Sequence, residues 1–178
     1  MTGSTDVHHF HRENVFQHTN KQHPTSRTIM VAVDDSKHSN YAFQWYLNNV
    51  AKAGDLVYLV NVYQPAVTPG SVALEMVHKA HLESIEVELE KHSHELVKRF
   101  CDEVVKHHAD LQVVGLSLRG GAGAELLVKS EELGCEVIVV GARGLTALER
   151  AALGSTSEFL VHNATTASVV VCKMPDTA

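Results

Sequence analysis

The sequence predicts an α/β domain built on an open, five-stranded parallel sheet with helices on both faces. Five short apolar runs alternate with four helical stretches between residues 27 and 174. The runs are apolar at consecutive positions, which is typical of strands buried on both faces. Strands and helices that alternate in this way form parallel sheets covered by their own crossover helices. The 178 residues, 44% of them hydrophobic, are enough for one domain with a core of its own.

The first half of the domain contains two strands and two helices. Thr28–Val33 is predicted as the first strand, and apolar residues at helical spacing predict a helix over Asn40–Ala53. Gly54 is expected to cap the end of that helix. Leu56–Val62 is the second strand, and residues from about 72 to 108 form a long helix with one apolar face.

The second half adds three strands and two helices. Leu111–Leu118 is the third strand, and a helix follows over Ala122–Leu133. Glu136–Val140 is the fourth strand, Ser155–Asn163 is the last helix, and Ser168–Lys173 is the last strand. In such sheets ligands bind beyond the carboxyl ends of the strands, where the order of the strands reverses.

The composition excludes several classes of protein. The net charge is −6 and no basic patch stands out, which argues against nucleic-acid binding. No apolar run approaches the roughly 20 residues that cross a bilayer. The N-terminus lacks the basic and apolar segments of a signal peptide. The three cysteines have no CxxC spacing, and reduced thiols in a cytoplasmic protein are expected.

The two ends of the chain lie outside the predicted domain. Residues 1–26 are polar and histidine-rich and lack apolar periodicity, so a disordered or loosely attached arm is expected there. The domain itself is expected over residues 27–174, and residues 175–178 form a short tail.

The most informative stretch is EVIVVGARGLTALERAALGSTS, residues 136–157. Gly141 follows the predicted fourth strand directly, Gly144 comes three residues later, and Gly154 and Ser155 stand at the start of the last helix. Glycine lets the backbone approach an anion closely, and a helix N-terminus offers unpaired N–H groups with a partial positive charge. Together these features predict a phosphate site.

The same residues also allow interpretations without a ligand. Glycines after a strand often only make a turn. Ser155 and Glu158 fit a capping box, with Ser155 as the N-cap and Glu158 at the third helical position. Asp34, which follows the first strand, could be a turn or N-cap residue, and Arg143 could be a solvated loop residue.

The spacing G-x2-G-x9-G-[ST] resembles the nucleotide-binding signature of the universal stress protein family. The segments VAVDDS, VNVYQP and SVVVCK extend the resemblance over residues 27–174. The resemblance implies an adenine nucleotide alpha hydrolase-like fold with the strand order 3-2-1-4-5. It also implies a site for ATP or AMP, with Mg²⁺ accompanying ATP.

The resemblance also implies which residues form the nucleotide site. These are Val33, Asp34, Val62, Val140, Gly141, Arg143, Gly144, Gly154, Ser155, Thr156 and Ser157. Asp34 would accept a hydrogen bond from the adenosine part, Val62 would hold adenine through its backbone, and Val140 would pack near the ribose or base. Gly141, Arg143 and Gly144 would border the ribose and phosphates. Residues 154–157 would cradle the phosphates.

The implied function is adenine-nucleotide binding by a stress-response sensor or switch, with no catalytic residue assigned. A weak ATPase and a dimeric interaction protein without nucleotide dependence are the alternatives. The last strand, Ser168–Lys173, is short and apolar and lies at the sheet edge in the implied order. An exposed edge strand invites pairing with a second copy, so a homodimer is expected through this strand.

Overall fold

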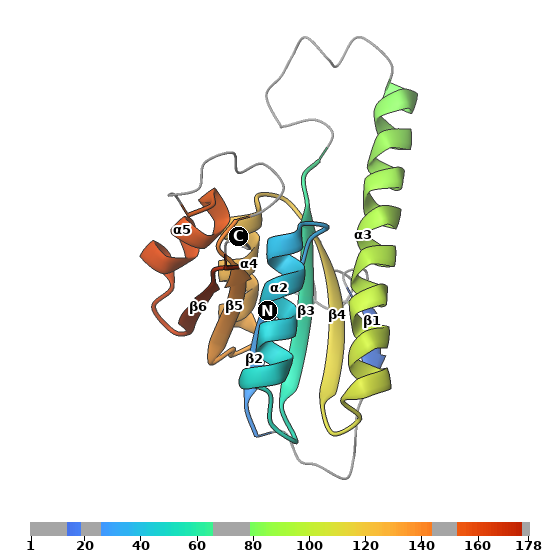
Figure 1. Cartoon of the computed structure of the whole chain (residues 1–178). Helices are drawn as coiled ribbons and strands as arrows, with labels where there is room; N and C mark the ends of the chain where they lie inside the picture. Colours follow the sequence, from blue (N-terminus) through green and yellow to red (C-terminus); the bar gives the residue numbers. More distant parts are fainter. Residues whose placement is uncertain (1–13, 19–25, 66–78, 144–152, 176–178) are drawn as a thin grey trace, which may run out of the picture.

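A computed structural model describes residues 14–18, 26–65, 79–143 and 153–175. Its centre is a six-stranded sheet in the order β1-β4-β3-β2-β5-β6 (Figure 1). The strands are β1 (Asn14–His18), β2 (Thr28–Ala32), β3 (Leu56–Tyr63), β4 (Gln112–Arg119), β5 (Val137–Gly141) and β6 (Ser168–Cys172). The last five of these pair in parallel. The predicted parallel sheet and its strand order 3-2-1-4-5 are therefore confirmed.

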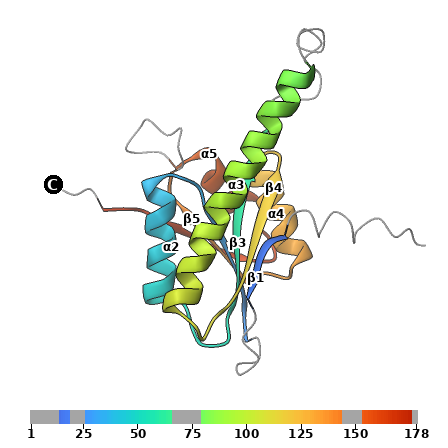
Figure 2. The ribbon, with the colours of Figure 1, turned by 90° about the vertical axis from the view of Figure 1, so that its right-hand side faces the viewer.

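Helices cover both faces of the sheet, as predicted (Figure 2). They are α2 (Lys37–Asn49), α3 (Lys79–His107), α4 (Ala122–Glu132) and α5 (Ser155–Asn163). α2 and α3 lie on one face, and α4 and α5 lie on the other. The predicted start of the long helix, at residues 72–78, lies outside the described residues.

α2 begins three residues before the predicted start and ends four residues before the predicted end. It begins early because the Ser36 hydroxyl accepts a hydrogen bond from the Ser39 N–H group at 3.0 Å, which makes Ser36 the N-cap. Val50 is the C-cap. Gly54 does not cap the helix. It has φ of 85° and makes the turn into β3, where a side chain would be strained.

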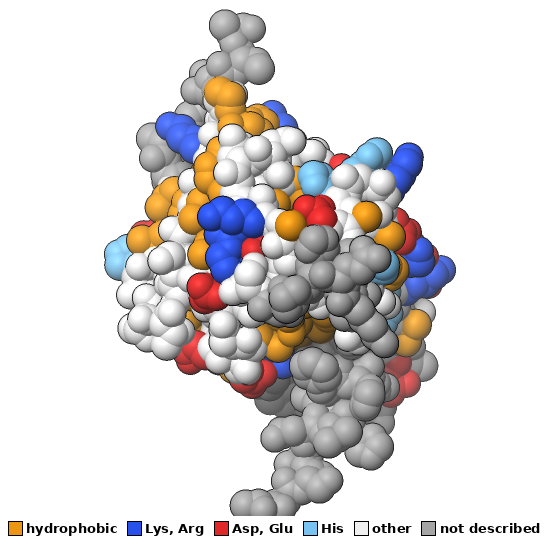
Figure 3. All heavy atoms as spheres, turned by 90° about the horizontal axis from the view of Figure 1, so that it is seen from below, with side chains coloured by type: hydrophobic (Ala, Val, Ile, Leu, Met, Phe, Trp, Pro, Cys, Tyr) orange, Lys and Arg blue, Asp and Glu red, His pale blue; other side chains and the backbone are white. Residues whose placement is uncertain are grey.

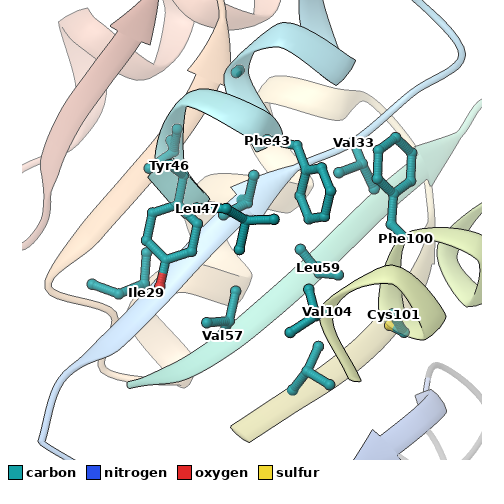
Figure 4. Packing of buried hydrophobic residues seen from close by; sticks show 14 of the residues in the cluster. Ile29, Val33, Phe43, Tyr46, Leu47, Val57, Leu59, Phe100, Cys101 and Val104 are labelled. Carbon is teal, nitrogen blue, oxygen red and sulfur yellow. The ribbon is translucent and has the colours of Figure 1, made fainter. Parts of the chain in front are cut away.

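Each central strand contributes to two hydrophobic cores because successive side chains point to opposite faces. Ile29 and Val31 of β2 pack under α2 and α3, whereas Met30 packs with α4 and α5. Figure 4 shows the first of these cores, in which the rings of Phe43 and Phe100 meet edge to face with centroids 4.8 Å apart. This aromatic pair joins α2 to α3 above the sheet.

The expected disorder of the N-terminal arm is wrong for residues 14–18. These residues form β1, which pairs antiparallel with the outer edge of β4. Val15 and Phe16 pack against the core beneath α2 and α3. The segment NVFQH has two adjacent apolar residues and no alternation, so no periodic signal predicts a strand there.

A buried carboxylate joins three elements at the amino-terminal end of the sheet. The Asp55 side chain is fully buried. Arg27 donates to it from Nε at 2.9 Å and from Nη2 at 2.6 Å, the Lys52 N–H group donates at 2.9 Å, and the Tyr46 hydroxyl donates at 3.3 Å. Arg27 also donates to the carbonyl of Val50 at 3.0 Å. The start of β2, the end of α2 and the turn before β3 are thereby tied together.

The electrostatics of this cluster favour its charged form. The hydrogen bond to Asp55 raises the pKa of Arg27 above its ordinary value. Burial, together with the nearby Asp55 charge, raises the pKa of Tyr46, so this hydroxyl stays a donor. From this end of the molecule, acidic, basic and apolar side chains are interspersed over the described surface (Figure 3).

Replacing Asp55 with Asn should lower the free energy of unfolding by about 3–5 kcal/mol, because Arg27 then lacks its counter-charge. Denaturant titration followed by circular dichroism measures this change. The control is Asp110→Asn, at an exposed carboxylate, which should change stability by less than about 0.5 kcal/mol. Equal effects of the two variants would contradict a structural role for Asp55.

Candidate functional site

The sheet reverses its direction of winding at β2. β3 and β4 lie on one side of β2, and β5 and β6 lie on the other. In open parallel sheets the ligand crevice forms beyond the carboxyl ends of the two strands at such a point. Those strands here are β2 and β5, which lead into Asp34 and Ala142 respectively. Most of the site residues predicted from the sequence lie at this edge, and Gly144 lies outside the described residues.

The turn after β2 holds Asp34 in a fixed position. Its N–H group donates to the Ser39 hydroxyl at 2.8 Å, and its Oδ1 accepts from the Ser36 N–H group at 2.8 Å. The side chain therefore does act in the turn, as the interpretation without a ligand requires. Oδ2 of Asp34 has no hydrogen-bond partner in the described part of the chain, so one carboxylate oxygen stays available to a ligand.

The end of β2 is shaped by a side chain that was not predicted from the sequence. The Val33 N–H group donates to the carbonyl of Val60 at 2.9 Å. A continued parallel ladder would next join the Val62 N–H group to the carbonyl of Val33. The Asn61 amide takes that carbonyl instead, at 2.7 Å. A polar residue inside the apolar run LVYLVNV is the signal that could have identified Asn61.

Because the Asn61 amide takes the carbonyl of Val33, the backbone groups of Val62 are left without their partners in the ladder. Tyr63 faces β4, because its carbonyl accepts from the Gly120 N–H group at 3.0 Å. Backbone groups alternate along a strand, so those of Val62 face the opposite side, beyond the end of β2. Neither its N–H group nor its carbonyl has a partner among the described residues. A donor and an acceptor on one residue suit the edge of a planar heterocyclic base.

Gly141 brings β5 into close contact with α2. A Cβ atom at position 141 would lie 2.8 Å from the carbonyl oxygen of His38 and 3.1 Å from the nitrogen of Ser39. Both are backbone atoms of the first turn of α2, so they cannot move aside. The first glycine of the motif is thus required by packing, whether or not a ligand is bound. The Nδ1 atom of His38, in the same turn, is buried and has no hydrogen-bond partner among the residues that the structure describes.

The residue after Gly141 anchors the start of α5. The carbonyl of Ala142 accepts from the Gly154 N–H group at 2.7 Å, so the two ends of the intervening loop meet. The Ser157 hydroxyl lies 2.8 Å from the carbonyl of Gly154 and 3.2 Å from that of Ala142. This hydroxyl is buried and contacts the carbonyls of Ala142 and Gly154, so it links β5 to α5 and is not presented to a ligand.

The alternative interpretation of this segment as a capping box that begins at Ser155 is wrong by one residue. Gly154 is the N-cap, with extended φ and ψ of −68° and 153°, and Ser155 is already the first helical residue. Glu158 therefore lies at the fourth helical position, and its N–H group donates to the carbonyl of Gly154 at 2.9 Å. The cap lies at Gly154 because Ala142 fixes its N–H group outside the helix.

The N-cap residue of α5 is therefore a glycine, which has no side chain to cap the helix. The N–H groups of Ser155, Thr156 and Ser157 precede the first intrahelical hydrogen bond, and the described part of the structure offers them no acceptor. Three such N–H groups and the positive end of the helix dipole are suited to an anion such as phosphate. Arg143 is half-buried at the end of β5, and Val140 is buried within that strand.

The described residues show no metal site, no membrane span and no reactive cysteine. No group of three or more His, Cys, Asp or Glu side chains is placed there to hold a metal ion. No described helix is long and apolar enough to cross a membrane. The three cysteines are free and buried, and burial raises the pKa of Cys101 and Cys135 to about 12 and that of Cys172 to about 11. Their thiols stay protonated at neutral pH.

Comparison with known proteins gives one family. The model of the universal stress protein family matches residues 25–173. The chain is 26% identical over 160 residues to the universal stress protein PHOS32 of Arabidopsis thaliana and 29% identical over 150 residues to a universal stress protein of Mycolicibacterium smegmatis. Each match covers 84% of the chain, but only 66% and 49% of the relatives' own lengths.

Solved structures share the fold. The universal stress protein UspA from Lactobacillus plantarum has a TM-score of 0.68 at 21% identity, over 83% of this chain and 97% of that one. A family protein from Arabidopsis thaliana with AMP bound has a TM-score of 0.58 at 17% identity, covering 85% and 94%. A universal stress protein in complex with cAMP has a TM-score of 0.56 at 18% identity, covering 82% and 96%.

The family model spans all five parallel strands of the sheet, including the ends of β2 and β5. The chain therefore belongs to the universal stress protein family.

Proposed function

We propose that this universal stress protein binds an adenine nucleotide, AMP or ATP, in the crevice between the ends of β2 and β5. The observation that carries the proposal is the uncapped N-terminus of α5, which Ala142 ties to the end of β5. Solved family members hold AMP and cAMP, so adenine nucleotides are ligands of this fold.

The two ends of the crevice suit the two ends of a nucleotide. Backbone N–H groups at Ser155–Ser157 suit the phosphates. The free carboxylate oxygen of Asp34 suits a ribose hydroxyl, which is a hydrogen-bond donor. The open N–H and carbonyl of Val62 suit the adenine edge, which also carries both a donor and an acceptor. Gly141 and Arg143 lie between these groups in the chain.

We assign the protein the role of a sensor or switch that responds to nucleotide occupancy. Among the described residues, the phosphate end presents N–H groups and hydroxyls, which hold phosphate without activating water. ATP would bring its Mg²⁺ with it, and slow hydrolysis is the alternative outcome. Time-dependent release of ADP or AMP from bound ATP distinguishes the two roles.

The phosphate end is tested by giving α5 a cap of its own. In Gly154→Asp, a carboxylate would accept from the same N–H groups and repel phosphate, so AMP affinity should fall roughly tenfold or more. Stability should not fall, because aspartate is a better N-cap than glycine by a few tenths of a kcal/mol. Calorimetric titration and thermal unfolding measure the two effects.

The matched control is Gly121→Asp at the start of α4. Gly121 is also an N-cap without a side-chain hydrogen bond, and a Cβ atom there meets nothing within 4 Å. This variant should stabilise its helix similarly and leave AMP affinity within about threefold of the wild type. Unchanged AMP affinity in Gly154→Asp would show that the phosphates do not bind at the N-terminus of α5.

The nucleoside end is tested at Asp34. Asp34→Asn keeps an oxygen for the Ser36 N–H group but removes the charge and the second acceptor, so adenosine and AMP should both weaken roughly ten- to a hundredfold. Asp35→Asn is the control and should leave both affinities unchanged. The carboxylate of Asp35 pairs with His92 at 2.6 Å and with Arg99 at 3.2 Å, both on α3. If AMP weakens in the Asp34 variant while adenosine does not, Asp34 does not contact the nucleoside.

We further propose that two copies pair through β6. Ser168 donates to Glu136 and Cys172 accepts from Ala142, both at 2.9 Å, so residues 168, 170 and 172 face β5. The backbone groups of Val169 and Val171 therefore point outward from the sheet. Under two-fold symmetry, these groups suit an antiparallel ladder with a second copy.

Val169→Pro removes one outward N–H group and should convert a dimer into monomers without unfolding the domain. Sedimentation velocity at micromolar concentration measures the mass, and Val169→Ala, which keeps the N–H group, should stay dimeric. A dimer that survives Val169→Pro would show that the copies meet elsewhere.

A further inference from the structure

The two edges of the sheet are closed differently. β6 forms one edge of the sheet and has no strand on its outer side among the described residues, whereas β1 pairs with β4 at the other edge. β1 comprises residues 14–18, and the family match begins only at residue 25. The strand that closes the β4 edge is therefore an addition of this chain to the family domain.

Without β1, the β4 edge would favour association. β4 is eight residues long, its residues Gln112–Leu118 are all buried, and it carries no charge before Arg119. A long, flat, apolar edge strand without a charge or proline is a template for pairing with another chain. The outer edge of β4 thus needs a cover.

The fit between β1 and β4 centres on Gly115. Phe16 lies opposite Gly115 in the antiparallel register. A Cβ atom at position 115 would lie 2.5 Å from Cγ1 of Val97, 2.8 Å from Sγ of Cys101 and 3.2 Å from Cβ of Phe16. The missing side chain lets α3 and Phe16 approach the strand together. An aromatic residue across from a strand glycine covers the backbone that the glycine leaves bare.

A bulge in β1 adds a second apolar contact. The register shifts between Asn14 and Phe16, so Val15 is an extra residue in β1. Neighbouring residues of a regular strand face opposite sides, but here Val15 and Phe16 both pack against the core beneath α2 and α3. Gln17 is exposed. The pairing is thus specified by two apolar side chains and one glycine.

We propose that β1 is an intramolecular cap that closes the β4 edge against a second copy of the chain. Together with the β6 pairing proposed above, the cap would confine assembly to the β6 edge. When the cap is removed, the β4 edges of two copies pair in its place. Association through β4 needs neither the nucleotide nor the β6 interface, so its test is independent of both.

The first test is hydrogen exchange in full-length Phe16→Asp, with Gln17→Asp as the matched control. The Gln112 N–H group donates to Asp55 on the β3 side, so the amides of Val113 and Gly115 face β1 and those of Val114 and Leu116 face β3. At concentrations low enough to keep the variant monomeric, the Phe16 variant should accelerate exchange at Val113 and Gly115 roughly tenfold or more. Exchange at Val114 and Leu116, and at all four sites in the control, should stay as in the wild type.

The second test is the mass of the same two variants at higher concentration. Phe16→Asp should at least double the mass of the wild-type species, and it should form still larger assemblies if β6 also pairs. A peptide of residues 12–20 added in excess should restore the wild-type mass, and the same peptide with Asp at position 16 should not. If circular dichroism shows that Phe16→Asp is unfolded, Phe16→Ala takes its place in both tests.

Three results would contradict the proposal that β1 caps the β4 edge. One is equal exchange at Val113 and Gly115 in the wild type and the Phe16 variant. Another is faster exchange at those amides with no rise in mass at any concentration. The third is a rise in mass that the peptide of residues 12–20 does not reverse.

Discussion

Gly141 and Ala142 hold the carboxyl edge of the sheet together, and the candidate site depends on them. Gly141 has no side chain, so β5 can touch the backbone of the first turn of α2. The N–H group of Ala142 donates to Cys172 of β6, and its carbonyl accepts from Gly154 at the start of α5. Two adjacent residues thus set the positions of α2, α5 and β6 around the end of β5. These contacts fix the N-terminus of α5 relative to the end of β5 and the first turn of α2, which are the elements of the proposed nucleotide site.

The two ends of the sheet differ in how their polar groups are paired. At the amino-terminal end, Asp55 is fully buried and accepts from Arg27, Tyr46 and Lys52, so its hydrogen bonds are made within the protein. At the carboxyl end, the N–H groups at the start of α5 and the backbone of Val62 have no partners in the described residues. Unpaired polar groups on a rigid support are available to a ligand, which is the usual condition of a binding site.

Much of this arrangement could be predicted from the sequence, because strands buried on both faces are continuously apolar and glycine marks the end of β5. The features that could not be predicted depend on contacts between distant residues. β1 exists because Phe16 fits over Gly115, which is 99 residues away in the chain. The N-cap of α5 lies at Gly154 and not at Ser155 because Ala142 takes its N–H group. The open backbone of Val62 depends on the Asn61 amide reaching across to Val33.

The most direct test of adenine-nucleotide binding is a titration of the wild-type protein with AMP, followed by the backbone amide resonances. The amides of Ser155, Thr156 and Ser157 should shift with the phosphate end, and the amide of Val62 should shift with the adenine end. All four should follow one saturation curve. Saturation without a shift at these four amides, or shifts confined to other parts of the sheet, would contradict a nucleotide site between β2 and β5.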